Sequence, residues 1–300
     1  MTEWALHPAA PPRAVLREQF RAVGLVLRSP AAAMGALLAL ALLFAVAKMG
    51  HERTVIDFHP ERWIIPGLVG LLLPIVVWRG EAHFGAAFLW TLPVDRRRHA
   101  LAKVGAGWVW LMAGVGIFVL WLLALTLVSG GNVLGAETLK MIPAFPQPGP
   151  RLDPGTIRTA VWRPEPVLWL VPFTAATGTY LLSSALALGV RHPFRWMGGV
   201  VLGVFLMVTA SDAANADGLA QLPEHLMGML VGGRYGLEAF LIASTETLKV
   251  ETALTTGEMV VVWRGLPDPG QWARATLLWT ALGLAALWAA ASRHREDRRA

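Results

Sequence analysis

The chain has 300 residues, of which 55% are hydrophobic and only 15% are charged, and its mean hydropathy is +0.51. These proportions are typical of a multi-span membrane protein and argue against a water-soluble core. The sequence contains no cysteine, which excludes disulfides, thiolate chemistry and cysteine metal sites. The net charge of +6 would suit a nucleic-acid partner, but the distribution of the basic residues decides between that partner and a membrane.

A basic amphipathic helix is predicted at residues 13–28. One helical stripe is apolar and the adjacent stripe is basic; the first holds Leu16, Phe20, Val23 and Leu27, and the second holds Arg17, Arg21 and Arg28. We expect this helix to lie flat at the inner membrane interface. The alternative is an ordinary helix that flanks a span. Ser29-Pro30 is then expected to start the first span as its N-cap and first helical residue.

Apolar stretches that reach or approach the roughly 20 residues needed to cross a bilayer predict six spans, at 31–49, 63–79, 104–128, 166–190, 196–212 and 274–292. The second and fifth are short, and snorkelling arginines at their ends can make up part of the deficit. A further apolar stretch at 225–243 is interrupted by Gly232-Gly233-Arg234, so we interpret it as an interfacial or re-entrant helical pair. The predicted fold class is an all-α integral membrane protein.

The orientation follows from the basic residues in the loops. With the N-terminus inside, the inside segments are 1–30, 79–103, 190–196 and 293–300, and they hold 15 of the 26 Lys and Arg residues but only 6 of the 20 Asp and Glu residues. Both termini are therefore predicted to be cytoplasmic. The basic excess marks topology, and no nucleic-acid partner is expected, because no basic patch with interleaved aromatics stands on a soluble domain.

Two outer segments are more than simple loops. The segment 129–165 is rich in proline, and residues 141–166, which carry seven prolines, are expected to be extended and irregular. The segment 213–273 contains two β-type runs around Thr255-Thr256-Gly257, which predicts a hairpin over 247–264. The chain is thus divided into a cytoplasmic N-terminus (1–30), five spans (31–212), this outer segment, and a sixth span with a basic tail (274–300).

Several chemical motifs are missing from the sequence. It has no G-x-x-x-x-G-K-[ST] loop, no H-E-x-x-H and no G-x-S-x-G, which argues against a nucleotide site, a zinc protease site and a serine nucleophile within this chain. His51, Asp57 and His59 cluster in the first outer loop and could bind a metal, but we favour solvated loop residues and predict no metal site. We also predict no cofactor bound by this chain.

The predicted spans carry no charged residue at their centres. Because ion-coupled transporters usually place an ionisable side chain at depth, any transport is expected to take its energy from outside the chain. Polar side chains gather in the fourth span and are candidates for a translocation path: Thr174, Thr177, Tyr180, Ser183 and Ser184. The alternative is that they form interhelical hydrogen bonds and cap the backbone near glycine.

The stretch between the second and third spans combines an apolar edge with a basic run. Phe84, Phe88 and Leu92 are spaced four apart, Pro93 ends their helix, and Asp95 can cap the next one. Arg96, Arg97 and Arg98 then occupy a helical first turn, where the dipole disfavours positive charge. A purely local explanation therefore fails, and we interpret the stretch as a docking surface for a partner.

The residues Glu81, Gly85, Leu89, Leu92-Pro93-Val94, Arg96-Arg97 and Lys103 resemble the cytoplasmic loop between spans two and three of type-2 ABC exporter permeases. The resemblance extends to the amphipathic N-terminal helix, the six spans and an outer elaboration before the last span. The length of 213–273 and the proline content of 129–165 depart from the family pattern.

The resemblance implies a permease subunit in the bacterial inner membrane that works as a dimer with a second permease and with separate ABC ATPase subunits, which bind ATP and Mg. The coupling residues would be Glu81, Phe84, Phe88, Leu92, Pro93, Arg96, Arg97 and Arg98. The outer segments leave room for an extracytoplasmic accessory protein. The alternatives are a non-transport structural subunit of a membrane complex and, less favoured, a membrane-embedded enzyme.

Overall fold

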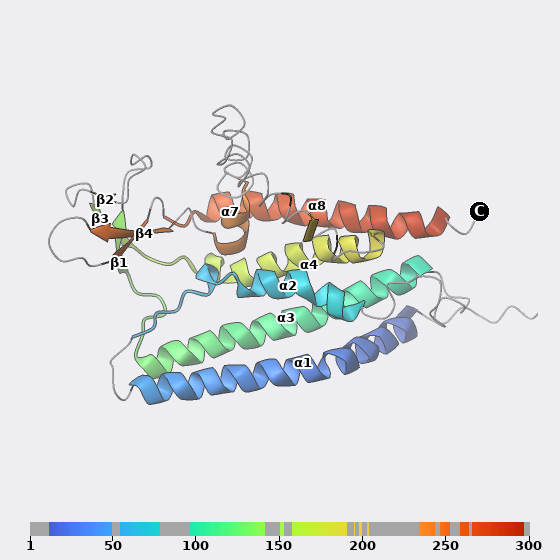
Figure 1. Cartoon of the computed structure of the whole chain (residues 1–300), viewed down its shortest axis with the longest axis horizontal. Coiled ribbons are helices and arrows are strands. Elements are labelled where there is room, and N and C mark those ends of the chain that lie inside the picture. The colour runs from blue at the N-terminus through green and yellow to red at the C-terminus, as the bar shows by residue number, and fades with distance from the viewer. Residues whose placement is uncertain are drawn as a thin grey trace, which may run out of the picture.

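The computed structural model describes residues 12–49, 55–78, 96–141, 151–152, 158–190, 235–243, 247–252, 259–263 and 266–296, together with residues 195, 198, 199 and 203. The long helices lie side by side along the long axis of the molecule, and a small sheet lies at one end (Figure 1). The described chain is therefore a helical bundle with a β-structured cap, which agrees with the predicted mostly helical class.

The bundle consists of α1 (Pro12–Met49), α2 (Ile65–Val77), α3 (Arg96–Ser129), α4 (Val171–Gly189) and α8 (Pro269–Glu296). Among the described residues, four helical segments are long and apolar enough to cross a membrane, at Arg13–Leu43, Arg97–Ser129, Pro166–Gly189 and Pro269–Ser292. The last of the four segments matches the predicted sixth span. At 13 residues, α2 is about 20 Å long, shorter than the hydrocarbon core.

The prediction of two separate N-terminal helices is wrong. Residues 13–28 and the first span form the single 38-residue helix α1, with Pro30 inside it. A proline removes one backbone hydrogen bond, but Ala31, Ala32 and Ala33 follow it, and alanine has the highest helix propensity. The helix therefore continues through Ser29-Pro30, and Ser29 does not cap a new helix.

The centre of the bundle is α4, which packs against α2, α3 and α8, whereas α1 packs mainly on α3. Glycines permit the closest approaches. A Cβ on Gly70 of α2 would overlap the Ala176 carbonyl oxygen, and a Cβ on Gly283 of α8 would lie 2.8 Å from the Leu181 Cβ. Helix packing in lipid depends on such small residues. By contrast α1 is largely exposed: only 6% of the most apolar 18-residue stretch of this helix is buried.

The sheet has five strands in the order β2-β4-β5-β1-β3. They are β1 (Glu137–Met141), β2 (Arg151–Leu152), β3 (Arg158–Trp162), β4 (Thr247–Thr252) and β5 (Met259–Trp263). The antiparallel pairing of β4 with β5, from Thr247↔Trp263 to Glu251↔Met259, confirms the predicted hairpin. The pairing of β1 with β3 corrects the expectation that 141–166 is irregular, because β3 lies within that range.

Both outer segments thus contribute to one sheet, because β1 also pairs in parallel with β5 at Met141↔Trp263. A one-turn helix η1 (Pro60–Arg62) precedes α2, a second, η4 (Pro166–Leu170), precedes α4, and a short helix α7 (Leu237–Ile242) packs on α8. Most of the predicted fifth span (196–212), residues 225–234 of the predicted 225–243 pair and the loop 79–95 lie outside the described residues.

Candidate functional site

The end of the bundle away from the sheet holds the described part of the predicted coupling site. Arg96 begins α3, and the side chains of Arg97 and Arg98 are described. The other predicted coupling residues lie outside the described residues: Glu81, Phe84, Phe88, Leu92 and Pro93. The apolar edge of the docking surface therefore stays a prediction, and the structure locates only the two points between which the loop runs.

These two points are joined by a contact between a cation and an aromatic ring. Trp78 follows the last residue of α2 and is 2% exposed, and Lys103 on α3 is 5% exposed. The Lys103 Nζ lies 4.7 Å from the centroid of the Trp78 ring. A desolvated ammonium over an indole is attracted by the ring quadrupole. The contact joins the end of α2 to the third turn of α3.

The entrance of α3 also contacts the two outermost helices. The Arg97 guanidinium carbon lies 3.7 Å from the centroid of the Trp288 ring on α8. On the other side, Gln19 Nε2 of α1 lies 3.5 Å from His99 Nδ1. The first turns of α3 therefore touch α1, α8 and, through Lys103, the end of α2.

The candidate path residues lie on α4, where some of them form hydrogen bonds to neighbouring helices and others form them within their own helix. Tyr180 is fully buried, and its hydroxyl donates to the Val104 carbonyl of α3 at 2.8 Å. Ser183 Oγ donates to the Leu71 carbonyl of α2 at 2.5 Å. Ser184 is fully buried beside them. These three residues sit where α4 meets its neighbours.

The two threonines of the same group bond within their own helix. Thr174 Oγ1 donates to the Val171 carbonyl at 3.1 Å, and Thr177 Oγ1 donates to the Phe173 carbonyl at 2.7 Å. Thr177 also accepts from Trp108 Nε1 of α3 at 3.1 Å. These are the contacts that the alternative of interhelical bonds and backbone capping predicts. A substrate path along these residues stays a prediction.

A buried cluster of charged side chains at the sheet end was not predicted as a site. His59 is 7% exposed and Glu61 is 1% exposed. The Nδ1 of His59 lies 2.8 Å from Glu61 Oε1, its Nε2 is hydrogen-bonded to Glu137 of β1, and Arg62 Nη2 donates to Glu137 Oε2 at 3.0 Å. Trp162 of β3 covers the cluster, stacking on His59 at 5.9 Å and lying under Arg62 at 5.6 Å.

The electrostatics of this cluster favour charged His59. Burial lowers the pKa of His59, but the hydrogen bonds to Glu137 and Glu61 outweigh it, and the net effect raises the pKa above its ordinary value. Burial raises the pKa of Glu137, but the hydrogen bond from His59 and the charge of Arg62 lower it overall. The arrangement therefore joins η1 to β1 with charge-assisted hydrogen bonds.

This arrangement adds no support for a metal site in the first outer loop. Asp57 Oδ1 accepts the backbone N–H of Asn132 at 2.8 Å, and His51 lies outside the described residues. Within the described part of the chain, no group of three or more His, Asp or Glu side chains is placed to hold a metal ion. The local signal for the charged cluster was His59-x-Glu61-Arg62 directly before an apolar run, but its partner Glu137 lies in a distant segment.

The chain matches no protein-family model, no curated protein and no solved structure. Its function therefore has to be argued from the geometry of the two ends of the bundle and from the residues of segment 81–103.

Proposed function

We propose that this chain is the membrane-spanning permease subunit of an ATP-driven ABC exporter. The observation that carries the proposal is the packing of the residues on either side of segment 79–95: Lys103 packs on Trp78, and Arg97 packs on Trp288. A loop that receives force from an ATPase must be held at both of its ends, because slack at either end would absorb the movement. This anchoring, together with the residues that resemble a permease coupling loop, supports the assignment.

The contacts of α3 supply a route for the movement. Its 34 residues make a helix about 51 Å long, longer than the roughly 30 Å hydrocarbon core. Its first turns touch α1 and α8 as well as the end of α2. When the ATPase pair closes on the loop, a displacement of the start of α3 would move these helices as a packed unit, as in rigid-body transitions.

The export path would open where α4 meets α2 and α3. Tyr180 and Ser183 bond to backbone carbonyls of those two helices, so separating α4 would free these polar groups, with Thr174, Thr177 and Ser184 on the same helix. Polar groups exposed in lipid surroundings need new partners. A polar substrate or water in the opened path would supply them.

The remaining parts of the transporter belong to other chains. ATP and Mg²⁺ would bind to a separate ABC ATPase, because this sequence has no phosphate-binding loop. The exposed apolar faces of the bundle, which include Leu37 at 61%, Leu40 at 64% and Leu120 at 65% exposure, would meet lipid and a second permease subunit. The start of α1 and the end of α8 lie at the same end of the bundle (Figure 1), which suits two cytoplasmic termini in an inner membrane.

The direct test is co-purification of the permease with an ABC ATPase subunit of the same cell. We expect Phe88→Asp to insert normally and to lose the ATPase, because an acidic group replaces an apolar contact. Leu134→Asp is the matched control: Leu134 is 50% exposed and lies near the sheet end. Full retention of the ATPase by Phe88→Asp contradicts the proposal, as does equal loss in both variants. ATP turnover should appear only when both proteins are present.

A further inference from the structure

The first half of α1 carries a stripe of arginines. Arg13, Arg17, Arg21 and Arg28 fall within about 80° of one another at roughly 100° per residue. All four are exposed. Arg13, Arg17 and Arg21 form no ion pair with any residue that the structure describes. Because positive charges close together repel one another, a bound anion would stabilise this stripe.

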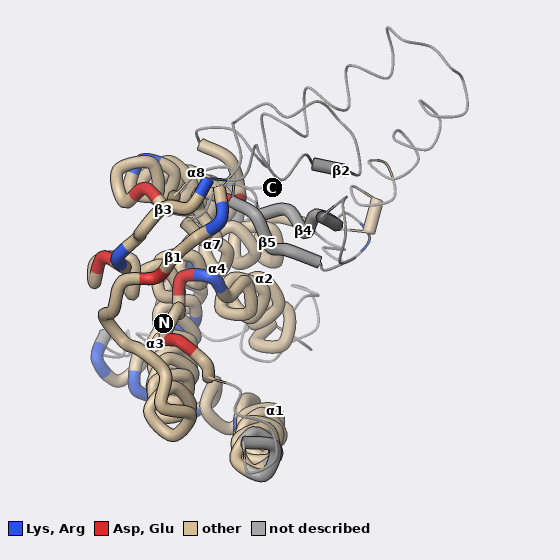
Figure 2. The backbone as a smooth tube through the Cα atoms, turned by 90° about the vertical axis from the view of Figure 1, so that its left-hand side faces the viewer, with Lys and Arg blue, Asp and Glu red and all other residues tan. Residues whose placement is uncertain are grey.

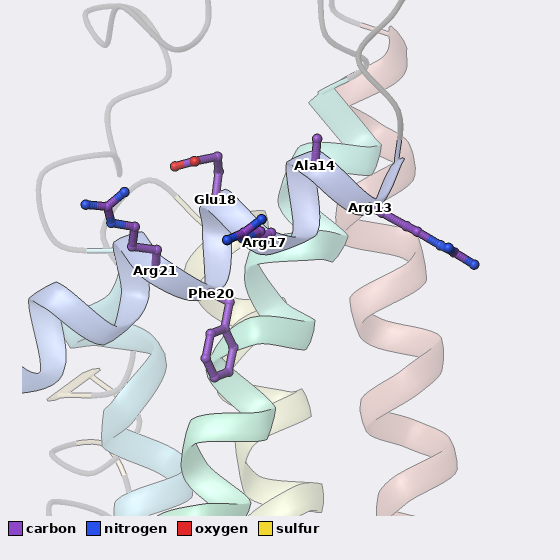
Figure 3. Close-up of a pocket in the computed structure, with 6 residues that line it drawn as sticks. All are labelled: Arg13, Ala14, Arg17, Glu18, Phe20 and Arg21. Carbon is purple, nitrogen blue, oxygen red and sulfur yellow. The ribbon is translucent and has the colours of Figure 1, made fainter.

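Three of these arginines line a surface hollow of about 680 Å³, together with Ala14, Glu18 and Phe20 (Figure 3). In Figure 3 Glu18 stands between Arg17 and Arg21, and Phe20 points to the opposite side, toward α3. The negative charge of Glu18 would repel an anion, but the three arginines carry more positive charge than Glu18 cancels. The hollow is therefore cationic on balance and has an apolar side.

The apolar side is a ledge shared by α1 and α3. The Phe20 ring stacks on Trp110 with centroids 4.9 Å apart, and Trp110 Nε1 donates to the Phe20 carbonyl at 3.1 Å. The two side chains remain 39% and 37% exposed. Beyond Arg28 the helix is apolar without interruption from Pro30 to Leu43. A ligand here would meet arginines at one end and an uninterrupted hydrocarbon surface at the other.

We infer that Arg13, Arg17 and Arg21 bind the phosphate of an anionic phospholipid, with its acyl chains along the Phe20–Trp110 ledge and the apolar length of α1. Guanidinium groups match phosphate oxygens in charge and in geometry. Basic residues beside a membrane helix favour anionic lipids. The site does not depend on an ATPase partner, so its failure would leave the proposed function standing.

The test measures binding of fluorescent phosphatidylglycerol and phosphatidylcholine to the full chain in detergent. We expect the wild type to prefer phosphatidylglycerol. Arg17→Ala/Arg21→Ala should weaken phosphatidylglycerol binding at least threefold, and Glu18→Gln should tighten it. Arg158→Ala/Arg163→Ala is the matched control, because it removes two exposed arginines at the sheet end, and it should leave binding unchanged.

Other results would overturn the inference. Equal binding of the two lipids, or unchanged phosphatidylglycerol binding by Arg17→Ala/Arg21→Ala, removes the lipid site. Displacement of the lipid by inorganic phosphate or glycerol phosphate at equal concentration would assign the stripe to a free anion. If Arg17→Ala/Arg21→Ala loses ATPase co-purification but keeps the preference for phosphatidylglycerol, the arginine stripe binds a protein partner instead. Elution of each variant as a single peak in size exclusion shows that these substitutions on an exposed helix face leave the fold intact.

Discussion

The two ends of the bundle handle charge in opposite ways. At the sheet end, His59, Glu61, Arg62 and Glu137 are drawn together, and the histidine and Glu61 are almost completely buried. Seen from that end, basic and acidic stretches of the backbone alternate around β1 and the loops beside it (Figure 2). At the opposite end, Arg97 rests on the 60% exposed ring of Trp288, and the arginines of α1 stand in the open.

This difference in the burial of charged side chains indicates which end can hold one arrangement and which end can change its contacts. Breaking a buried charge network leaves charged groups stranded and costs several kcal/mol, so such a network holds one arrangement. Cations over exposed rings lose about 0.5–1 kcal/mol when they separate, so the contact of Arg97 with Trp288 separates more easily than the buried contact of Lys103 with Trp78. The sheet end therefore suits a fixed frame, and the opposite end suits a surface that moves or receives a partner.

The largest effect is expected at the buried cluster. Glu137→Ala would leave His59 and Arg62 without their shared carboxylate, and we expect the free energy of unfolding to fall by about 3 kcal/mol. Thermal unfolding in detergent measures this change. Glu165→Ala, which removes an exposed carboxylate just beyond β3, should stay within about 0.5 kcal/mol. Similar decreases in the free energy of unfolding of the two variants would show that the cluster does not stabilise the sheet end.

A smaller effect is expected from pH. Because the folded pKa of His59 is raised above 6.5, its contribution is complete below that value and is lost as pH rises through the folded pKa. Because the folded pKa of Glu137 is lowered from 4.5, its contribution is complete above that value and is lost as pH falls through the folded pKa. Stability should be highest between these two ordinary values.

The size of the loss on either side should be about 1–2 kcal/mol, the value of a charge-assisted hydrogen bond. His59→Gln removes the titrating group, so it should flatten the alkaline side of the stability profile while the acid side remains. Unfolding temperatures measured from pH 2 to pH 9 follow the loss of stability on both sides. An alkaline decline of the same size in His59→Gln would assign the pH dependence to another group.

The smallest stability effect is expected at the opposite end. Arg97→Ala should lower the free energy of unfolding by about 0.5–1 kcal/mol, because the Trp288 ring is largely exposed. Under the proposed function, ATP turnover of the assembled transporter should nevertheless fall several-fold, and Arg97→Lys should restore most of it. If turnover changes no more than stability does, Arg97 does not transmit force.

Local features of the fold could be predicted from the sequence, and distant pairings could not. The β4–β5 hairpin was predictable because its two strands are neighbours joined by a turn-forming segment. The β1–β3 pair was missed because prolines between the strands favoured an irregular loop. The continuity of α1 was missed because Ser29-Pro30 has the form of a helix start, and only the strong helix formers after it outweigh that signal.

The same limit applies to the candidate sites. The basic run at Arg96, Arg97 and Arg98 is visible in the sequence, but nothing in it identifies Trp288 as a neighbour of Arg97. His59 and Glu137 likewise belong to separate segments that only the sheet brings together. Residue type and local spacing indicate where charge is concentrated, whereas the partners that determine its energy come from tertiary packing.

The sheet combines strands from two distant segments of the chain, so it can be completed only after both segments have been synthesised. Met141 of β1 must wait for Trp263 of β5, its parallel partner, to leave the ribosome. By then α1 to α4 have already been synthesised, and α8 follows. Pairing between such distant segments is slow, because a long loop must close first. Until β5 arrives, the β1 edge of the β1–β3 ribbon stays unpaired, and a chaperone that covers that edge would protect the unfinished protein.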